Sequence, residues 1–254
     1  MQLRVLGCSG GIGHGRATTS LLINDSVLLD AGTGLCDQGL DALRKIRDVY
    51  LTHSHLDHVA GIPLLVDTIF DSLSSPLTVH GRPETLEALR RHVFNGVMWP
   101  DFTVIPEPAR PALRFAPMAV GERREVAGCD VRSIEVNHAV PAVGYRVDCG
   151  GKVLAFSGDT TTNETFWEAL NAAPRLELLI VEVAFPEEDL ELSRLAHHYC
   201  PSTLAADLAR LRHRPRIYLT HFKPGAEDRI LSQCRAAVPD RDLQPLRPGD
   251  CFEI

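Results

Sequence analysis

The sequence predicts an α/β fold in a single domain spanning residues 1–254. Short apolar runs of strand length recur along the chain, and several are apolar on both faces, as in strands of a sheet that helices cover. Helical patterns lie between these runs, and no linker rich in Ser, Pro or Gly and no block of charge divides the chain. Strands and helices mixed throughout in this way are typical of one α/β domain.

The expected elements begin with a strand, because residues 1–7 alternate between polar and apolar side chains. Two helices are expected over residues 83–94 and 201–213, because each segment opens with a proline and places apolar residues on one face. Asn163 is the expected N-cap of a third helix, which contains Phe166. Further strands are expected at residues 21–23, 27–29, 49–51, 77–79, 153–156, 178–181 and 217–219.

Composition and charge restrict the classes of partner. Acidic residues number 33 against 26 basic ones, a net charge of -7, so binding to long nucleic acid is disfavoured. The seven cysteines are scattered and form no C-x-x-C pair, which predicts reduced thiols rather than a disulfide framework or a cysteine zinc site. Because no signal peptide opens the chain and no apolar run is long enough to span a bilayer, we expect a cytoplasmic protein that is not bound to a membrane.

Histidines mark the candidate site. Tyr50-Leu51-Thr52-His53 recurs as Tyr218-Leu219-Thr220-His221, so two distant strands are expected to end by presenting a histidine at one sheet edge. The first copy continues with Ser54-His55-Leu56-Asp57-His58, which places three histidines and an aspartate within six residues. Packing does not account for this density, and the pattern predicts a metal site.

The H-x-H-x-D-H string resembles that of the metallo-β-lactamase superfamily. The resemblance extends along the chain: Leu29–Gly32 is similar to the first motif of that superfamily, His138 to the third, Ser157–Thr160 to the fourth and Leu219–His221 to the fifth. It implies a four-layer αββα sandwich with two mixed β-sheets flanked by helices. Two similar halves would build that sandwich, which would also explain the Tyr-Leu-Thr-His repeat.

The resemblance further implies two divalent metal ions. Zinc is the expected metal. Manganese and iron are also admissible, because all the proposed ligands are nitrogen or oxygen donors and softness does not choose among the three metals. Asp159 would bridge the ions, and a shared water made acidic by both would become the hydroxide nucleophile. An aspartate here, where the common β-lactamases have a cysteine, argues against antibiotic hydrolysis. The implied ligands are His53, His55, His138 and Asp159 for the first ion, and Asp57, His58, Asp159 and His221 for the second.

Further motifs are similar to those of class II cyclic-nucleotide phosphodiesterases. Residues 55–65 fit the H-L-D-H-x-x-G-hydrophobic pattern, and His198–Pro201 and Val181–Pro186 are similar to two later elements. Tyr199 in place of Leu, and Ala184 where a small hydroxyl residue is frequent, depart from the pattern. The implied substrate is a small phosphodiester, namely a 3′,5′-cyclic nucleotide, with cyclic AMP expected, and a nucleoside monophosphate is the product.

Three residues are expected to be catalytic: Asp57, His198 and Glu182. A histidine titrates near neutrality, so His198 is suited to contact the phosphate or protonate the leaving alkoxide, and Glu182 to orient it. The alternatives are a polar surface residue at a helix entrance for His198 and a charged cap on a buried strand for Glu182.

Other hypotheses stay open at this point. A ribonuclease Z-like endonuclease that processes tRNA 3′ ends would have the same ligands, but no substrate-gripping arm is evident and the acidic charge disfavours it. A non-catalytic binding member, a lactone or thioester hydrolase, and a homodimer are also admissible. His14 and Arg16 lie in a glycine-rich loop, interpreted as a structural turn, with phosphate contact as the alternative. Trp99 is expected to stack a nucleobase, cover an oligomer interface or anchor a long loop.

Overall fold

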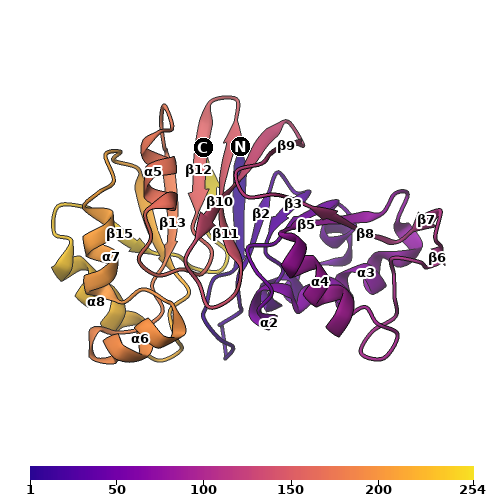
Figure 1. Cartoon of the computed structure of the whole chain (residues 1–254), viewed down its shortest axis with the longest axis horizontal. Coiled ribbons are helices and arrows are strands. Elements are labelled where there is room, and N and C mark those ends of the chain that lie inside the picture. The colour runs from indigo at the N-terminus through magenta and orange to yellow at the C-terminus, as the bar shows by residue number, and fades with distance from the viewer.

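The computed structural model describes residues 1–254. Two seven-stranded β-sheets pack face to face, and helices cover their outer sides (Figure 1). In spatial order, the first sheet contains β16 (Cys251–Glu253), β1 (Gln2–Gly7), β2 (Ser20–Ile23), β3 (Val27–Leu29), β4 (Asp48–Tyr50), β5 (Leu77–Gly81) and β8 (Leu113–Pro117). The second sheet contains β9 (Arg123–Val126), β10 (Cys129–Val136), β11 (Ala142–Cys149), β12 (Lys152–Phe156), β13 (Leu178–Glu182), β14 (Arg216–Thr220) and β15 (Leu243–Pro245). A separate small pair joins β6 (Pro106–Glu107) to β7 (Arg110–Pro111).

The helices form the two outer layers. Figure 1 shows α3 and α4 outside the first sheet and α5, α7 and α8 outside the second. The helices of the first half are α1 (Leu40–Leu43), α2 (Leu56–Val59), α3 (Gly61–Ile69) and α4 (Pro83–His92), with short turns at Thr33–Asp37 and Phe70–Ser72. Those of the second half are α5 (Thr165–Asn171), α6 (Leu190–Ala196), α7 (Pro201–Leu208) and α8 (Glu227–Ala237), with a short turn at Glu187–Asp189. No helix of the structure combines the length and the apolar character needed to cross a bilayer.

Three apolar cores separate the four layers. One core fills the space between the sheets, and each of the others lies between a sheet and its helices. Strand β12 illustrates the cause, because successive side chains of a strand point to opposite faces: Val153 and Ala155 pack towards the helices, whereas Leu154 and Phe156 pack towards the other sheet. This arrangement confirms the predicted αββα sandwich.

The two sheets have the same pattern of directions. Counted from β16 in the first sheet and from β9 in the second, three antiparallel pairings are followed by three parallel ones. By this order β4 corresponds to β13, and β14 corresponds to β5. The Tyr-Leu-Thr-His repeat therefore lies on strands that are not equivalent, and the explanation of the repeat by two similar halves is wrong.

The expected strands all form, most of them with shifted ends, whereas both proline-led helices are shorter than expected. Helix α4 ends at His92 and α7 at Leu208. Asn163 accepts a hydrogen bond from the backbone N–H of Phe166 (3.0 Å), as expected of a cap, although the helix itself starts at Thr165. The long hairpin of β10 and β11 was not expected, because polar residues interrupt its apolar ones and leave no continuous apolar run.

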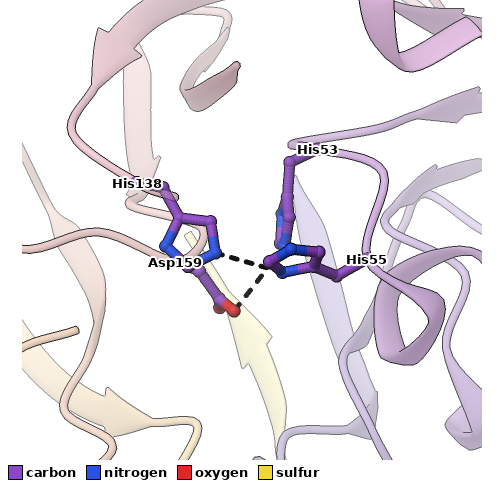
Figure 2. Close-up of side chains that lie close together, drawn as sticks. All are labelled: His53, His55, His138 and Asp159. Carbon is purple, nitrogen blue, oxygen red and sulfur yellow. Dashed lines mark hydrogen bonds and ion pairs between the residues drawn. The ribbon is translucent and has the colours of Figure 1, made fainter. Parts of the chain in front are cut away.

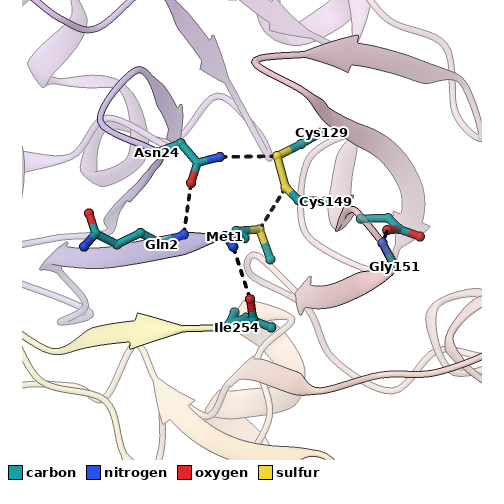
Figure 3. The surroundings of a disulfide bond; sticks show 8 residues. Met1, Gln2, Asn24, Cys129, Cys149, Gly151 and Ile254 are labelled. Carbon is teal, nitrogen blue, oxygen red and sulfur yellow. Dashed lines mark hydrogen bonds between the residues drawn. A yellow bond between two sulfur atoms is a disulfide. The ribbon is translucent and has the colours of Figure 1, made fainter.

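The prediction that all seven cysteines are reduced is wrong. Cys129 and Cys149 form a disulfide between the paired strands β10 and β11, next to Met1 and Asn24 (Figure 3). The pairing of the two strands brings the two cysteines together, and their 20-residue separation gives no sign of this in the sequence. The cysteines therefore no longer favour a reducing compartment.

Candidate metal centre

The predicted ligands converge from both sheets at the carboxyl ends of parallel strands. His53 follows β4 in the first sheet, whereas Asp159 follows β12 and His221 follows β14 in the second. Each of these three side chains is nearly fully buried. Because parallel strands point the same way, their carboxyl ends form one edge, where α/β proteins commonly build sites.

The other predicted ligands come from a short helix and a loop. His55 is the N-cap residue of α2, and Asp57 and His58 lie within that helix. The tight turn from strand to helix directs these three side chains towards the site. His138 approaches from the opposite side, on the loop after β10.

The first group consists of His53, His55, His138 and Asp159, whose nearest ligand atoms all lie within 4.8 Å of one another. Figure 2 shows His53 and His55 reaching in from the first half and His138 and Asp159 from the second. His138 Nε2 lies 3.2 Å from His55 Nδ1, and His53 Nε2 lies 3.7 Å from Asp159 Oδ2. The structure thus brings together the four side chains proposed for the first ion.

The second group consists of Asp57, His58, Asp159 and His221, again with ligand atoms within 4.8 Å of one another. Asp159 belongs to both groups. Its Oδ2 lies 3.2 Å from His58 Nε2, and its Oδ1 lies 3.3 Å from His221 Nδ1. Because Oδ2 also lies 3.7 Å from His53 Nε2 of the first group, this carboxylate is next to histidines of both groups, as a shared ligand must be.

Buried nitrogen atoms without a hydrogen-bond partner indicate whether metal ions would fit between these side chains. His53 Nε2, His58 Nε2 and His221 Nδ1 are buried and have no hydrogen-bond partner. Buried polar atoms in folded proteins are nearly always bonded, so three orphaned imidazole nitrogens around one carboxylate need another partner. Divalent ions would supply it, because imidazole nitrogens and carboxylate oxygens are common metal ligands. The two His/Asp clusters are able to bind metal ions.

Asp30 orients part of this cluster. Its carboxylate accepts hydrogen bonds from the backbone N–H and hydroxyl of Thr52 (both 2.8 Å) and lies 2.7 Å from His58 Nδ1. In the neutral form of His58, donation of the Nδ1 proton to Asp30 leaves the Nε2 lone pair pointing to the cluster. Asp30 lies within the Leu29–Gly32 motif, but no role could be predicted for it from the sequence, because its contact with His58 is formed only by folding.

Two of these residues have unusual backbone conformations. Asp30 and His221 adopt positive φ angles of 56° and 64°. This left-handed conformation costs a residue with a Cβ roughly 1 kcal/mol or more, and such residues cluster at functional sites. In both residues it places the side chain at the sheet edge directly after a strand.

Burial sets the protonation of the histidines. It is the main cause that lowers the pKa of His53 and His55, and it lowers that of His138 to about 4 and that of His221 to about 3. These imidazoles are therefore neutral near pH 7, with lone pairs free for a metal ion. His58 differs: burial opposes its charge, but Asp159 and Asp30 outweigh burial and raise its pKa.

His198 and Glu182 form a buried pair beside the cluster. His198 Nδ1 lies 2.8 Å from Glu182 Oε1, which also accepts the backbone N–H of Thr160 at 2.9 Å. The ring of His198 stacks on that of His221, with 5.3 Å between centroids. Burial acts to lower the pKa of His198, but Glu182 outweighs it and the pKa is raised. The pair has the geometry that the sequence analysis expected of an oriented histidine.

Tyr199, the departure from the phosphodiesterase pattern, has a buried polar partner. Its hydroxyl donates to Asp207 Oδ2 (2.6 Å) and accepts from the indole N–H of Trp167 (3.2 Å). Its backbone N–H points to Glu182 Oε2 at 3.4 Å. A leucine would leave the buried Asp207 carboxylate without this donor, so Tyr199 and Asp207 depend on each other for their hydrogen bonding.

Three other candidates lie apart from the cluster. Arg16 bonds to Glu227 on α8 (2.5 Å), and His14 is exposed; neither forms a hydrogen bond or ion pair with the proposed ligands. Both line a cavity of about 350 Å³ between the glycine-rich loop and α8. Trp99 packs against the core of the first half, which supports its interpretation as a loop anchor.

Comparison with known proteins identifies relatives along the whole chain. A family model described as the beta-lactamase superfamily domain matches residues 25–222. The chain is 25% identical to a probable 3′,5′-cyclic-nucleotide phosphodiesterase of Yersinia pestis, over 83% of this chain and 72% of that protein. It is 26% identical to a ribonuclease Z of Bradyrhizobium sp. (strain ORS 278), over 94% of this chain and 95% of that protein.

A third relative has a solved structure. A 64-residue segment is 39% identical to 3′,5′-cyclic-nucleotide phosphodiesterase 1 of Saccharomyces cerevisiae, and the match covers 25% of this chain and 17% of that protein. The crystal structure of unliganded yeast PDE1 superposes with a TM-score of 0.84 at 19% identity, over 100% of this chain and 99% of that one. This superposition shows that the fold is shared.

Proposed function

Because the chain belongs to the beta-lactamase superfamily, we propose that it is a metal-dependent hydrolase that cleaves a 3′,5′-cyclic nucleotide, cyclic AMP above all. The observation on which the proposal rests most is the shared carboxylate of Asp159, which faces both His/Asp groups beside the His198–Glu182 pair. Two relatives named as cyclic-nucleotide phosphodiesterases support the choice of substrate.

The two groups of side chains would hold two divalent ions, for which zinc is our first choice. Bound ions would supply Lewis acidity, making water more acidic and stabilising negative charge on the phosphoryl oxygens. Asp57 differs from the rest of its group because its side chain is 32% exposed, so it stands where water and substrate enter. We assign it to the second ion and to the positioning of the attacking water.

His198 is the proposed acid. Glu182 binds its Nδ1, so its Nε2 is the atom left to donate a proton to the leaving 3′-oxygen. The raised pKa of His198 keeps it protonated closer to neutral pH than an isolated buried imidazole would be. An alkoxide is a poor leaving group, so a cyclic phosphodiester needs this proton more than an activated ester does.

The test uses purified protein loaded with zinc or with manganese. We expect hydrolysis of cyclic AMP, and to a smaller extent of cyclic GMP and bis(p-nitrophenyl) phosphate, with a nucleoside monophosphate as the product of the cyclic nucleotides. If both metal sites are filled and no phosphodiester is turned over, the proposal fails.

A ribonuclease Z-like activity is the second candidate, and a relative of that name matches nearly the full chain. The net charge of -7 counts against a long polyanionic substrate. Cleavage of unprocessed tRNA at its 3′ end, with a steep dependence on salt, would favour this candidate. A non-catalytic role is disfavoured by the complete set of ligands, and a metal analysis that finds no bound ion would revive it.

Three predictions from the sequence stay predictions. They are a single domain over residues 1–254, a cytoplasmic location and a homodimer. Limited proteolysis, cell fractionation and sedimentation analysis would test them in turn.

A further inference from the structure

Lys223 is a cation without an acidic partner at the rim of the metal centre. It is one of only three lysines in the chain and lies two residues after His221. Its ammonium group donates to the backbone carbonyl of Gly10 at 3.2 Å and forms no ion pair with a carboxylate. Lys45, in contrast, has Asp25 at 3.7 Å. Because the side chain of Lys223 is half-buried, its charge is only partly hydrated, and an anion would stabilise it.

The contact with Gly10 places this ammonium group close to the proposed ligands. Gly10 packs so tightly on His221 that a Cβ at Gly10 would come within 2.4 Å of the His221 carbonyl oxygen and 3.0 Å of its ring. The carbonyl that accepts from Lys223 therefore belongs to a residue in contact with His221. This close approach excludes any residue but glycine at position 10.

A second contact places Lys223 beside His198. Its Nζ lies 5.7 Å from the ring centroid of Phe185, and that ring meets His198 edge-on at 5.8 Å. The Phe185 ring therefore neighbours both the ammonium group of Lys223 and the imidazole of His198.

We propose that Lys223 binds the anionic group of the substrate. An ammonium group has three donors, and Gly10 takes one, so two are free for phosphoryl oxygens. A substrate with a negative charge would then be preferred over a neutral lactone or thioester. This proposal rests on the proposed function only for the identity of the substrate as a phosphodiester.

The test measures the binding of inorganic phosphate to the metal-loaded protein by calorimetry. Lys223→Gln keeps a donor for the Gly10 carbonyl but removes the charge, and we expect the Kd for phosphate to rise about ten- to hundredfold. Lys223→Arg should restore most of the affinity. The metal content of each variant and binding by the control Lys152→Gln, which changes an exposed lysine, should stay as in the unmodified protein.

Other outcomes separate this proposal from the proposed function. Unchanged phosphate binding in Lys223→Gln, or loss of metal from it, would overturn the binding role, as would equal losses for anionic bis(p-nitrophenyl) phosphate and neutral p-nitrophenyl acetate. If phosphate binding weakens as expected while no cyclic nucleotide is hydrolysed, the proposed substrate is wrong and the anion-binding role of Lys223 stands.

Discussion

The two halves of the molecule each have a buried carboxylate after equivalent strands and use it in different ways. Asp30 follows β3 and Asp159 follows β12, the first strand of the parallel set in each sheet. Asp30 is occupied within its own half, by two groups of Thr52 and by His58. Asp159 faces histidines of both halves and accepts no backbone hydrogen bond there.

Their electrostatics differ accordingly. Burial raises the pKa of Asp30 despite its contact with His58. Burial acts in the same direction on Asp159, but the histidines around it, above all His221 and His58, outweigh it and lower the pKa. Carboxylates that follow equivalent strands have thus become an orienting group in one half and a candidate ligand in the other.

In the next pair of equivalent strands, β4 and β13, the first half supplies the candidate ligand and the second half supplies the orienting carboxylate. In the first half β4 leads to His53, a candidate ligand, whereas in the second half β13 ends in Glu182, which orients His198. Each half therefore supplies one buried carboxylate that holds a histidine, but from a different strand. Similar scaffolds contribute complementary parts, and neither half alone contains a complete group.

Removal of Asp159 should have the largest effect. Asp159→Ala takes a candidate ligand from both ions at once, so we expect bound metal to fall below two ions per chain and the rate to fall at least about 10²–10³-fold. Metal analysis and kcat on cyclic AMP measure this. Asp228→Ala, at an exposed aspartate, is the control. Two ions per chain and near-normal rates in Asp159→Ala would contradict the bridging role.

His198→Ala tests the orienting pair of the second half. Loss of a general acid typically costs about 10²–10⁴-fold, and we expect this range for cyclic AMP, whose leaving group is an alkoxide. Hydrolysis of bis(p-nitrophenyl) phosphate should fall much less, because nitrophenolate leaves without a proton. A uniform fall for both substrates would show that His198 acts in binding or structure instead.

Asp30→Asn tests the orienting pair of the first half. The amide keeps the size of the side chain but weakens its hold on His58, so we expect metal affinity to fall about 10–100-fold. Competition with a chelator measures this affinity. If the affinity is unchanged, the comparison with Asp159 loses its meaning, since Asp30 would then be a structural residue only.

Removal of the disulfide should have the smallest effect on activity. Cys149→Ser opens a loop of about 20 residues in the second half, and we expect the free energy of unfolding to fall by about 2–4 kcal/mol. The rate should not change, because the disulfide closes the end of the β10–β11 hairpin opposite the end that leads to His138. Denaturant titration measures the stability and kcat measures the rate. Cys251→Ser, at an exposed free cysteine, is the control for both.

Much of the site could be predicted because its ligands are dense in sequence or recognisable by motif. His53, His55, Asp57 and His58 lie within six residues, and folding keeps them together in a strand-to-helix turn. The strands next to them are continuous apolar runs, which a sequence shows directly. The layers of the fold followed from the same runs and from the family resemblance.

Other features depend on contacts between distant residues. The contact of Asp30 with His58 and that of Lys223 with Gly10 form only in the folded chain. The hairpin of β10 and β11 mixes polar and apolar residues, so the pairing that joins Cys129 to Cys149 was hidden as well. Local sequence patterns predict elements and short motifs, whereas contacts between separate elements are known only from the structure.

The division of each His/Asp group between the halves has a thermodynamic consequence. Each group takes two of its side chains from the first half and two from the second, counting Asp159 in both. A bound ion would therefore act as a reversible cross-link, stabilising the assembly of the halves by about 4 kcal/mol at a free concentration 1,000 times its Kd. The availability of metal in the surroundings would then add to the apolar core between the sheets in holding the two halves together.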